Sequence, residues 1–310
     1  MKIENEMLSE IKAMPAMAQA FLDKSKDYEL PLKVPYLGMG SSYFAPLAFK
    51  YMGINIHPEM ASEYYNYLQV GTKVPLGVLL SQSGKSSEVL WCAQLFEKYV
   101  AISNDLYSPL CNVASVVDTI HLMAGEEKYS SSKTYINTLL ALFKGFGIDA
   151  QNAVDVMSRN IDKYDNQGKL MAEEIFELIQ HNKVNGLYIT GSGPNIATAL
   201  QAALILSEST KLNFSGLPMA QYDHGPKETA KNSVVINILA KGQSYERSIR
   251  LGERIKEAGA QVFIIEEPAL TENESIISNI IPFNYMAYYL SELLNVQETF
   301  VVGGKVTEVN

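Results

Sequence analysis

The chain has 310 residues, enough for two domains or one large one. Its net charge of −9 and the absence of a basic stripe argue against nucleic acid as a main partner. No apolar run reaches the roughly 18 residues that span a bilayer, and the N-terminus has no signal-peptide pattern. We therefore expect a cytoplasmic protein with no membrane partner. The two cysteines, Cys92 and Cys111, lie in apolar stretches outside any metal-binding pattern, so we expect free, buried thiols.

In chain order, residues 7–24 have a helical pattern that Pro15 interrupts. A strand at 32–37 runs into a glycine-rich corner, and a helix follows over 45–51. Further strands are predicted at 55–58, 76–80, 99–103 and 117–122, with helices at 89–96 and 132–146. Strands that alternate with helices predict a parallel sheet covered on both faces.

The pattern then recurs after a helix at about 152–180. The Gly-x-Gly corner at Gly38 returns 153 residues later at Gly191, and further strands are predicted at 233–240 and 261–265. The predicted fold is therefore α/β, with two tandem domains, each a parallel sheet between helices in a three-layer sandwich. The predicted parts are an entry segment (1–24), a first domain (25–150), a bridging helix (151–183), a second domain (184–296) and a tail (297–310).

A serine-rich turn follows the strand at 76–80. Ser-Gln-Ser-Gly at 81–84 stands between this strand and a helical pattern, where turn N–H groups and the helix dipole favour an anion, most often a phosphate. The alternative is that these serines only cap helices. The second copy has Lys-Gly-Gln-Ser at 241–244, with fewer hydroxyl groups, so we expect one phosphate site of this kind, in the first half.

Three motifs together resemble the SIS (sugar isomerase) family: Gly-Met-Gly-Ser-Ser at 38–42, Leu-Ser-Gln-Ser-Gly at 80–84 and Asp-His-Gly-Pro at 223–226. Over nearly the whole chain the resemblance is to the isomerase half of glucosamine-6-phosphate synthase and to stand-alone sugar-phosphate isomerases and deaminases. It implies that the sugar phosphate is held by Gly40, Ser41, Ser42, Ser81, Gln82, Ser83, Ser86 and Ser131.

Two lysines and a loop add detail to this implied binding site. Lys85 occupies a position that is usually acidic in the relatives, where it would contact the phosphate or point into solvent. Glu126, with the Ser-Ser-Lys at 131–133, resembles a loop that closes over the substrate.

The resemblance also implies three catalytic residues. Glu208 would move a proton between C1 and C2 of the sugar, although the lysine that the family synthase has three residues earlier is Ile205 here. His224 would open the sugar ring and, as in the family, serve a neighbouring subunit, which implies a homodimer. Lys305 would hold the ketose as a Schiff base, unless it is simply a solvated lysine near the C-terminus; Glu298-Thr299 replaces a Pro-Arg pair of many relatives.

These residues together predict an enzyme that interconverts glucosamine 6-phosphate with fructose 6-phosphate and ammonia. Met1 leads straight into the entry helix, without the N-terminal cysteine of a glutaminase, so we expect no use of glutamine. No metal or organic cofactor is expected, because a carboxylate and a lysine supply the acid–base chemistry. The alternatives are a deglycase that acts on a sugar-phosphate adduct of an amino acid, and a sugar-phosphate sensor without catalysis.

Overall fold

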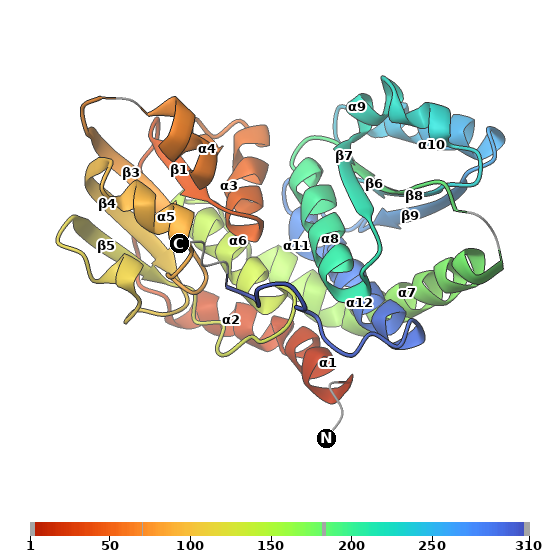
Figure 1. Cartoon of the computed structure of the whole chain (residues 1–310), viewed down its shortest axis with the longest axis horizontal. Coiled ribbons are helices and arrows are strands. Elements are labelled where there is room, and N and C mark those ends of the chain that lie inside the picture. Colours follow the sequence, from red (N-terminus) through yellow and green to blue (C-terminus); the bar gives the residue numbers. More distant parts are fainter. Residues whose placement is uncertain (1–3, 70, 182–183, 307–310) are drawn as a thin grey trace. The chain divides into compact units, whose positions relative to one another are not determined.

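The computed structural model describes residues 4–69, 71–181 and 184–306. The described chain divides into two compact units. The first-sheet unit comprises residues 13–151 and 300–306, and the second-sheet unit comprises 4–12 and 152–299, apart from the undescribed positions. Both are α/β structures in which helices flank a parallel sheet (Figure 1). The domain boundaries given above stay a prediction.

The first-sheet unit has five parallel strands in the order β2-β1-β3-β4-β5. Its helix α2 (Met14–Lys24) is separate from α1 (Glu4–Lys12) of the other unit, and the break falls next to Pro15, as predicted. The remaining elements are β1 (Pro35–Gly38), α3 (Ser41–Tyr51), β2 (His57–Met60), α4 (Ala61–Glu63), the π-helix η1 (Tyr64–Leu68), β3 (Val74–Leu80), α5 (Ser87–Ala93), β4 (Phe96–Ser103), the 3-10 helix η2 (Pro109–Cys111), β5 (Val116–His121) and α6 (Lys133–Gly145).

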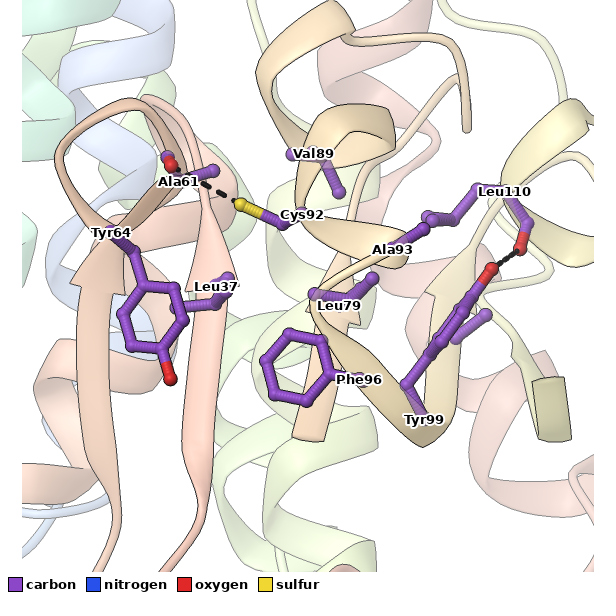
Figure 2. Packing of buried hydrophobic residues seen from close by; sticks show 11 residues of the cluster. Leu37, Ala61, Tyr64, Leu79, Val89, Cys92, Ala93, Phe96, Tyr99 and Leu110 are labelled. Atoms are coloured by element: carbon purple, nitrogen blue, oxygen red, sulfur yellow. Dashed lines mark hydrogen bonds between the residues drawn. The ribbon is translucent and has the colours of Figure 1, made fainter. Parts of the chain in front are cut away.

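Side chains that alternate along the strands build a core on each face of the first sheet. On one face, Leu37 and Leu79 pack with residues of α4, η1 and α5 (Figure 2). On the other face Tyr36 contacts Phe146, just after α6, with ring centroids 6.0 Å apart. The predicted helix at 89–96 is shorter than expected, because Phe96 is fully buried and already begins β4.

Cys92 also lies in the core shown in Figure 2, where its Sγ donates to the Ala61 carbonyl oxygen at 3.2 Å. Burial raises the pKa of this thiol to about 12. Cys92 is buried as expected, whereas Cys111 is only half-buried; both are free thiols.

The second-sheet unit has four parallel strands in the order β7-β6-β8-β9. Helices α9 and α10 pack over one face through a cluster that includes Tyr222, Val235 and Leu251, and α8 contacts α11 and α12. Strand β7 has no counterpart among the predicted elements. The elements are α1, α7 (Gln151–His181), β6 (Leu187–Gly191), α8 (Asn195–Thr210), β7 (Phe214–Pro218), α9 (Met219–Asp223), the 3-10 helix η3 (Pro226–Thr229), β8 (Val234–Leu239), α10 (Tyr245–Glu257), β9 (Gln261–Glu266), α11 (Ser275–Asn279) and α12 (Ile281–Leu293).

Candidate functional site

The glycine corner joins β1 to α3. A Cβ built on Gly38 would lie 2.5 Å from the backbone carbon and oxygen of Ser42, so only glycine permits this close turn. Gly40 has a positive φ of 50°, and α3 begins at Ser41. The helix has no side-chain cap, and Ser41 and Ser42 are half-buried. The corner therefore brings two hydroxyl-bearing residues to the start of α3.

The serine corner joins β3 to α5. Ser81 is only 2% exposed, and its Oγ lies 3.1 Å from the Oγ of Ser86. Ser86 stands at the N-cap of α5, yet no side chain caps that helix. Ser83 Oγ accepts a hydrogen bond from the Lys85 backbone N–H at 3.2 Å, while the Lys85 side chain is exposed. The simple capping alternative thus does not describe Ser86, whose hydroxyl contacts Ser81.

The order of the strands brings these two corners to one edge of the sheet. β1 and β3 are neighbours, with Leu37 opposite Leu79, and the chain passes outward from β1 to β2 on one side and from β3 to β4 on the other. In open parallel sheets, ligands bind beyond the carboxyl ends of the strands at the point where the strand order reverses. The glycine and serine corners both follow the strands at that point.

A loop between β5 and α6 forms around the fully buried side chain of Glu127. Its Oε1 accepts hydrogen bonds from the Ser132 N–H and Oγ, both at 3.0 Å, and from the Thr134 N–H at 3.1 Å. Its Oε2 accepts one from Thr134 Oγ1, and the neighbouring Ser131 Oγ lies 3.0 Å from Thr134 Oγ1. Glu127 therefore fixes the first turn of α6 and the serines before it.

The tail lysine, Lys305, docks on the same loop. Its Nζ donates to the backbone oxygens of Glu127 (2.9 Å) and Tyr129 (2.6 Å) and lies 3.2 Å from Glu127 Oε2. An ammonium group has three N–H donors, so these acceptors can use all of them. The last part of the predicted tail, residues 307–310, lies outside the described residues.

Glu208 belongs to the second-sheet unit, where it is half-buried on α8, two residues before the helix ends. Lys211, in the left-handed conformation just beyond the helix, donates through Nζ to the Glu208 backbone oxygen at 2.5 Å. Burial lowers the pKa of Lys211, and the negative charge of Glu208 opposes that effect. The other family position, Ile205, is fully buried on the same helix and packs as a core residue.

His224 is exposed at the end of α9 in the second-sheet unit. The residue before it, Asp223, is held by Lys227 at 3.0 Å and by Arg247 at 3.3 Å. The hydrogen bond from Lys227, helped by Arg247, lowers the pKa of Asp223. Two ion pairs thus fix the loop that presents the imidazole.

The second sheet has matching corners, but a carboxylate lies between them. Gly193 has a positive φ of 54°, as Gly40 does in the first sheet. A Cβ on Gly242 would lie 2.0–2.3 Å from the carboxyl atoms of Glu272, and one on Gly193 would lie 3.0 Å from Glu272 Oε1. Burial raises the pKa of Glu272. The chain's own acidic group therefore fills this edge of the second sheet.

Over residues 4–69, 71–181 and 184–306, no group of three or more His, Cys, Asp or Glu side chains is arranged to hold a metal ion. No helix in that part of the chain is long and apolar enough to cross a bilayer.

Comparisons with known proteins give relatives in sequence and in fold. No family model matches the chain. It is 25% identical to a glutamine–fructose-6-phosphate aminotransferase (isomerizing) of Pyrococcus horikoshii, over 94% of this chain and 53% of the relative. The chain thus spans about half the length of the curated relatives it matches.

Two solved structures share the fold. The C-terminal domain of a glucosamine-fructose-6-phosphate aminotransferase from Francisella tularensis has a TM-score of 0.74 at 19% identity. The match covers 93% of this chain and 96% of that domain's chain. A glucosamine-6-phosphate deaminase from Thermotoga maritima has a TM-score of 0.72 at 18% identity, covering 92% and 94%. The recognition made from the motifs is confirmed: the homologues of this chain are the isomerase (SIS) domains of glucosamine-fructose-6-phosphate aminotransferases.

Two carboxylates in these contacts were not found from the sequence. The family motif predicted a role for Glu126, which is exposed. Glu127 is instead the buried acceptor for α6 and Lys305. Glu272 gave no signal, because it lies 30 residues beyond Gly242 and meets it only in the folded unit. No local pattern singles out Glu127, because its role as an acceptor depends on how the loop before α6 folds.

Proposed function

We propose that this chain is a sugar-phosphate isomerase and deaminase that interconverts glucosamine 6-phosphate with fructose 6-phosphate and ammonia. The phosphate would be held by the serine corner (Ser81, Gln82, Ser83 and Ser86), and the sugar by Gly40, Ser41, Ser42 and Ser131. Glu208, His224 and Lys305 would carry the chemistry.

One observation supports this proposal most: two corners rich in hydroxyl groups follow β1 and β3, where the strand order reverses. The Ser86 hydroxyl contacts Ser81 and does not cap α5, so it can turn to an anionic oxygen. The net charge of −9 gives no general attraction for anions, so local donors would have to bind the phosphate. The names of the sequence and fold relatives favour an amino-sugar phosphate as the substrate.

In the deamination direction, His224 would first assist ring opening, which gives the C1 aldehyde. Glu208 would remove the C2 proton and return it to C1, while one proton passes from the nitrogen to the C1 oxygen, so that C1 becomes an alcohol carbon and C2 an imine. Water would then replace the nitrogen at C2, releasing ammonia and leaving the ketone of fructose 6-phosphate. The net reaction consumes one water and needs no oxidant or reductant.

Lys305 would hold the ketose as an imine at C2, a step that releases one water, and hydrolysis of that imine would take the water up again when the ketose leaves. Its Nζ donates to two carbonyl oxygens and lies against Glu127 in the ligand-free chain. A nucleophilic amine must be neutral. This step therefore requires Lys305 to leave at least one of these contacts and to lose a proton.

The test is a coupled assay for ammonia and for fructose 6-phosphate, with glucosamine 6-phosphate as the substrate. We expect both products in equal amounts, and a loss of turnover of about 100-fold or more in Glu208→Gln, which keeps the shape but not the base. Glu253→Gln, an exposed position on α10 of the same unit, is the matched control. Binding of hexose phosphates without turnover would favour the sensor, and release of an amino acid from a fructosamine-type phosphate would favour the deglycase.

A homodimer is part of the proposal, because His224 would serve a neighbouring subunit. Sedimentation equilibrium measures the oligomeric state, and mixing Glu208→Gln with His224→Gln chains tests the sharing. If the two residues act in one site across subunits, mixed dimers regain activity that neither variant has alone. A monomer with full activity would contradict this part.

A further inference from the structure

Lys133, the first residue of α6, is a buried cation that has no acceptor among the described residues. The residue as a whole is only 8% exposed. Within the described chain its ammonium group has no hydrogen-bonded oxygen and no carboxylate within 4 Å, and Lys305, not Lys133, takes the contact with Glu127. Burying a charge without a partner is costly.

The position adds a second cost. Lys133 stands at the N-terminus of α6, where the helix dipole disfavours a positive charge. The preferred partner of that helix end is an anion, and the carboxylate of Glu127 already has that place. A residue that is unfavourable on both counts is expected at a functional site more than elsewhere.

A short series of contacts ties Lys133 to the serine corner. A Cβ built on Gly125 would lie 3.9 Å from Lys133 Nζ, so the ammonium group lies against that glycine. The Gly125 carbonyl oxygen accepts a hydrogen bond from Asn104 Nδ2 at 2.7 Å, and the Asn104 backbone N–H donates to the Gln82 oxygen at 3.0 Å. The lysine and the serine corner thus belong to one connected edge of the first sheet.

We infer that Lys133 binds the phosphate group of the substrate and supplies a buried positive charge to the serine corner, whose own lysine, Lys85, is exposed. The ammonium group of Lys133 is already buried in the ligand-free chain. A ligand with a permanent negative charge, such as a phosphate, would offset the cost of burying it. Lys305 then has a different resting role: it orders the loop that presents Lys133. This inference rests on the proposed function only in taking a sugar phosphate as the ligand.

The test compares Lys133→Met with Lys73→Met, an exposed lysine just before the amino end of β3. Fructose 6-phosphate and inorganic phosphate are titrated calorimetrically into each protein. We expect Lys133→Met to weaken binding of both at least about tenfold, Lys133→Arg to recover part of the loss, and Lys73→Met to stay within twofold of the wild type.

Thermal unfolding without ligand gives a readout that does not depend on activity. Removal of an unpaired buried charge should leave the Tm of Lys133→Met unchanged or higher, while its rise with fructose 6-phosphate shrinks. A lower ligand-free Tm would mean that Lys133 is structural and would overturn the inference, as would a Kd within twofold of the wild type. If the wild type binds fructose 6-phosphate but releases no ammonia from glucosamine 6-phosphate, the proposed reaction fails and the binding result still decides the role of Lys133.

Discussion

The carboxyl edges of the two sheets have the same turns but hold different groups. In the first-sheet unit, the edge has the Ser81–Ser86 hydroxyl pair and a lysine, Lys305, that comes from the tail. In the second-sheet unit, the corresponding glycines face the carboxylate of Glu272. Glycine corners alone therefore do not make an anion site. The groups around them decide whether an anion is attracted or is already supplied by the chain.

The largest expected effect comes from removing the hydroxyl groups of the serine corner. Ser81→Ala combined with Ser86→Ala should weaken fructose 6-phosphate binding by roughly 100-fold, because each hydroxyl would otherwise donate to a charged oxygen. Calorimetric titration measures the change. Ser244→Ala at the second corner is the matched control and should alter the affinity less than twofold. Equal losses at both corners would remove the distinction between the two sheets.

Replacement by alanine should also have different effects on stability at Gly84, in the serine corner, and at Gly242, in the corresponding turn of the second sheet. Gly84 has a φ of 63°, and a Cβ there would lie 1.9 Å from Ser108 Oγ, so Gly84→Ala should lower the free energy of unfolding by about 3 kcal/mol. Gly242→Ala should cost less than about 1 kcal/mol, because the three atoms nearest its Cβ all belong to the movable end of the Glu272 side chain. Urea denaturation of the two variants measures both values. A cost at Gly242 as large as that at Gly84 would show that the Glu272 carboxylate is rigidly held.

The tail lysine provides the next test. Lys305→Met should lower stability by about 1–3 kcal/mol, because it removes donors from two carbonyl oxygens and from the buried Glu127 carboxylate. Hydrogen exchange should then increase at the backbone amides of Ser132 and Thr134. Lys98→Met, which removes an exposed lysine on β4 of the same unit, is the control. Unchanged exchange in Lys305→Met would mean that the tail does not order this loop.

The smallest effect is expected at Glu272. Glu272→Ala should leave the affinity for fructose 6-phosphate within twofold of the wild type, because the proposed phosphate site lies on the first sheet. Glu257→Ala, at the exposed end of α10, removes the same charge and is the control. A large loss of affinity in Glu272→Ala alone would point to a substrate site on the second sheet.

Local sequence patterns predicted much of the frame. Strand and corner signals predicted β1, β3 and β8, and Pro15 indicated the break between α1 and α2. These features depend on neighbours in the chain. The strand orders and the existence of β7 depend instead on which strands pair in the folded sheet. That pairing is not visible in the local sequence.

The candidate site was likewise predictable only where it depends on residues that are neighbours in the chain. The serines of both corners follow directly from their motifs, because each sits beside the strand that positions it. Choosing between Glu126 and Glu127 required the direction of each side chain in a loop without periodicity. The saturated contacts of Lys305 and the unpaired state of Lys133 both depend on contacts between distant segments, which no local pattern encodes.

The most direct test of the central claim is a crystal structure of the chain with fructose 6-phosphate bound. The account predicts the phosphate at the first-sheet edge, with its oxygens within hydrogen-bond distance of the Ser81, Ser83 and Ser86 hydroxyl groups. A phosphate bound at the second sheet beside Gly242, or away from both edges, would contradict it.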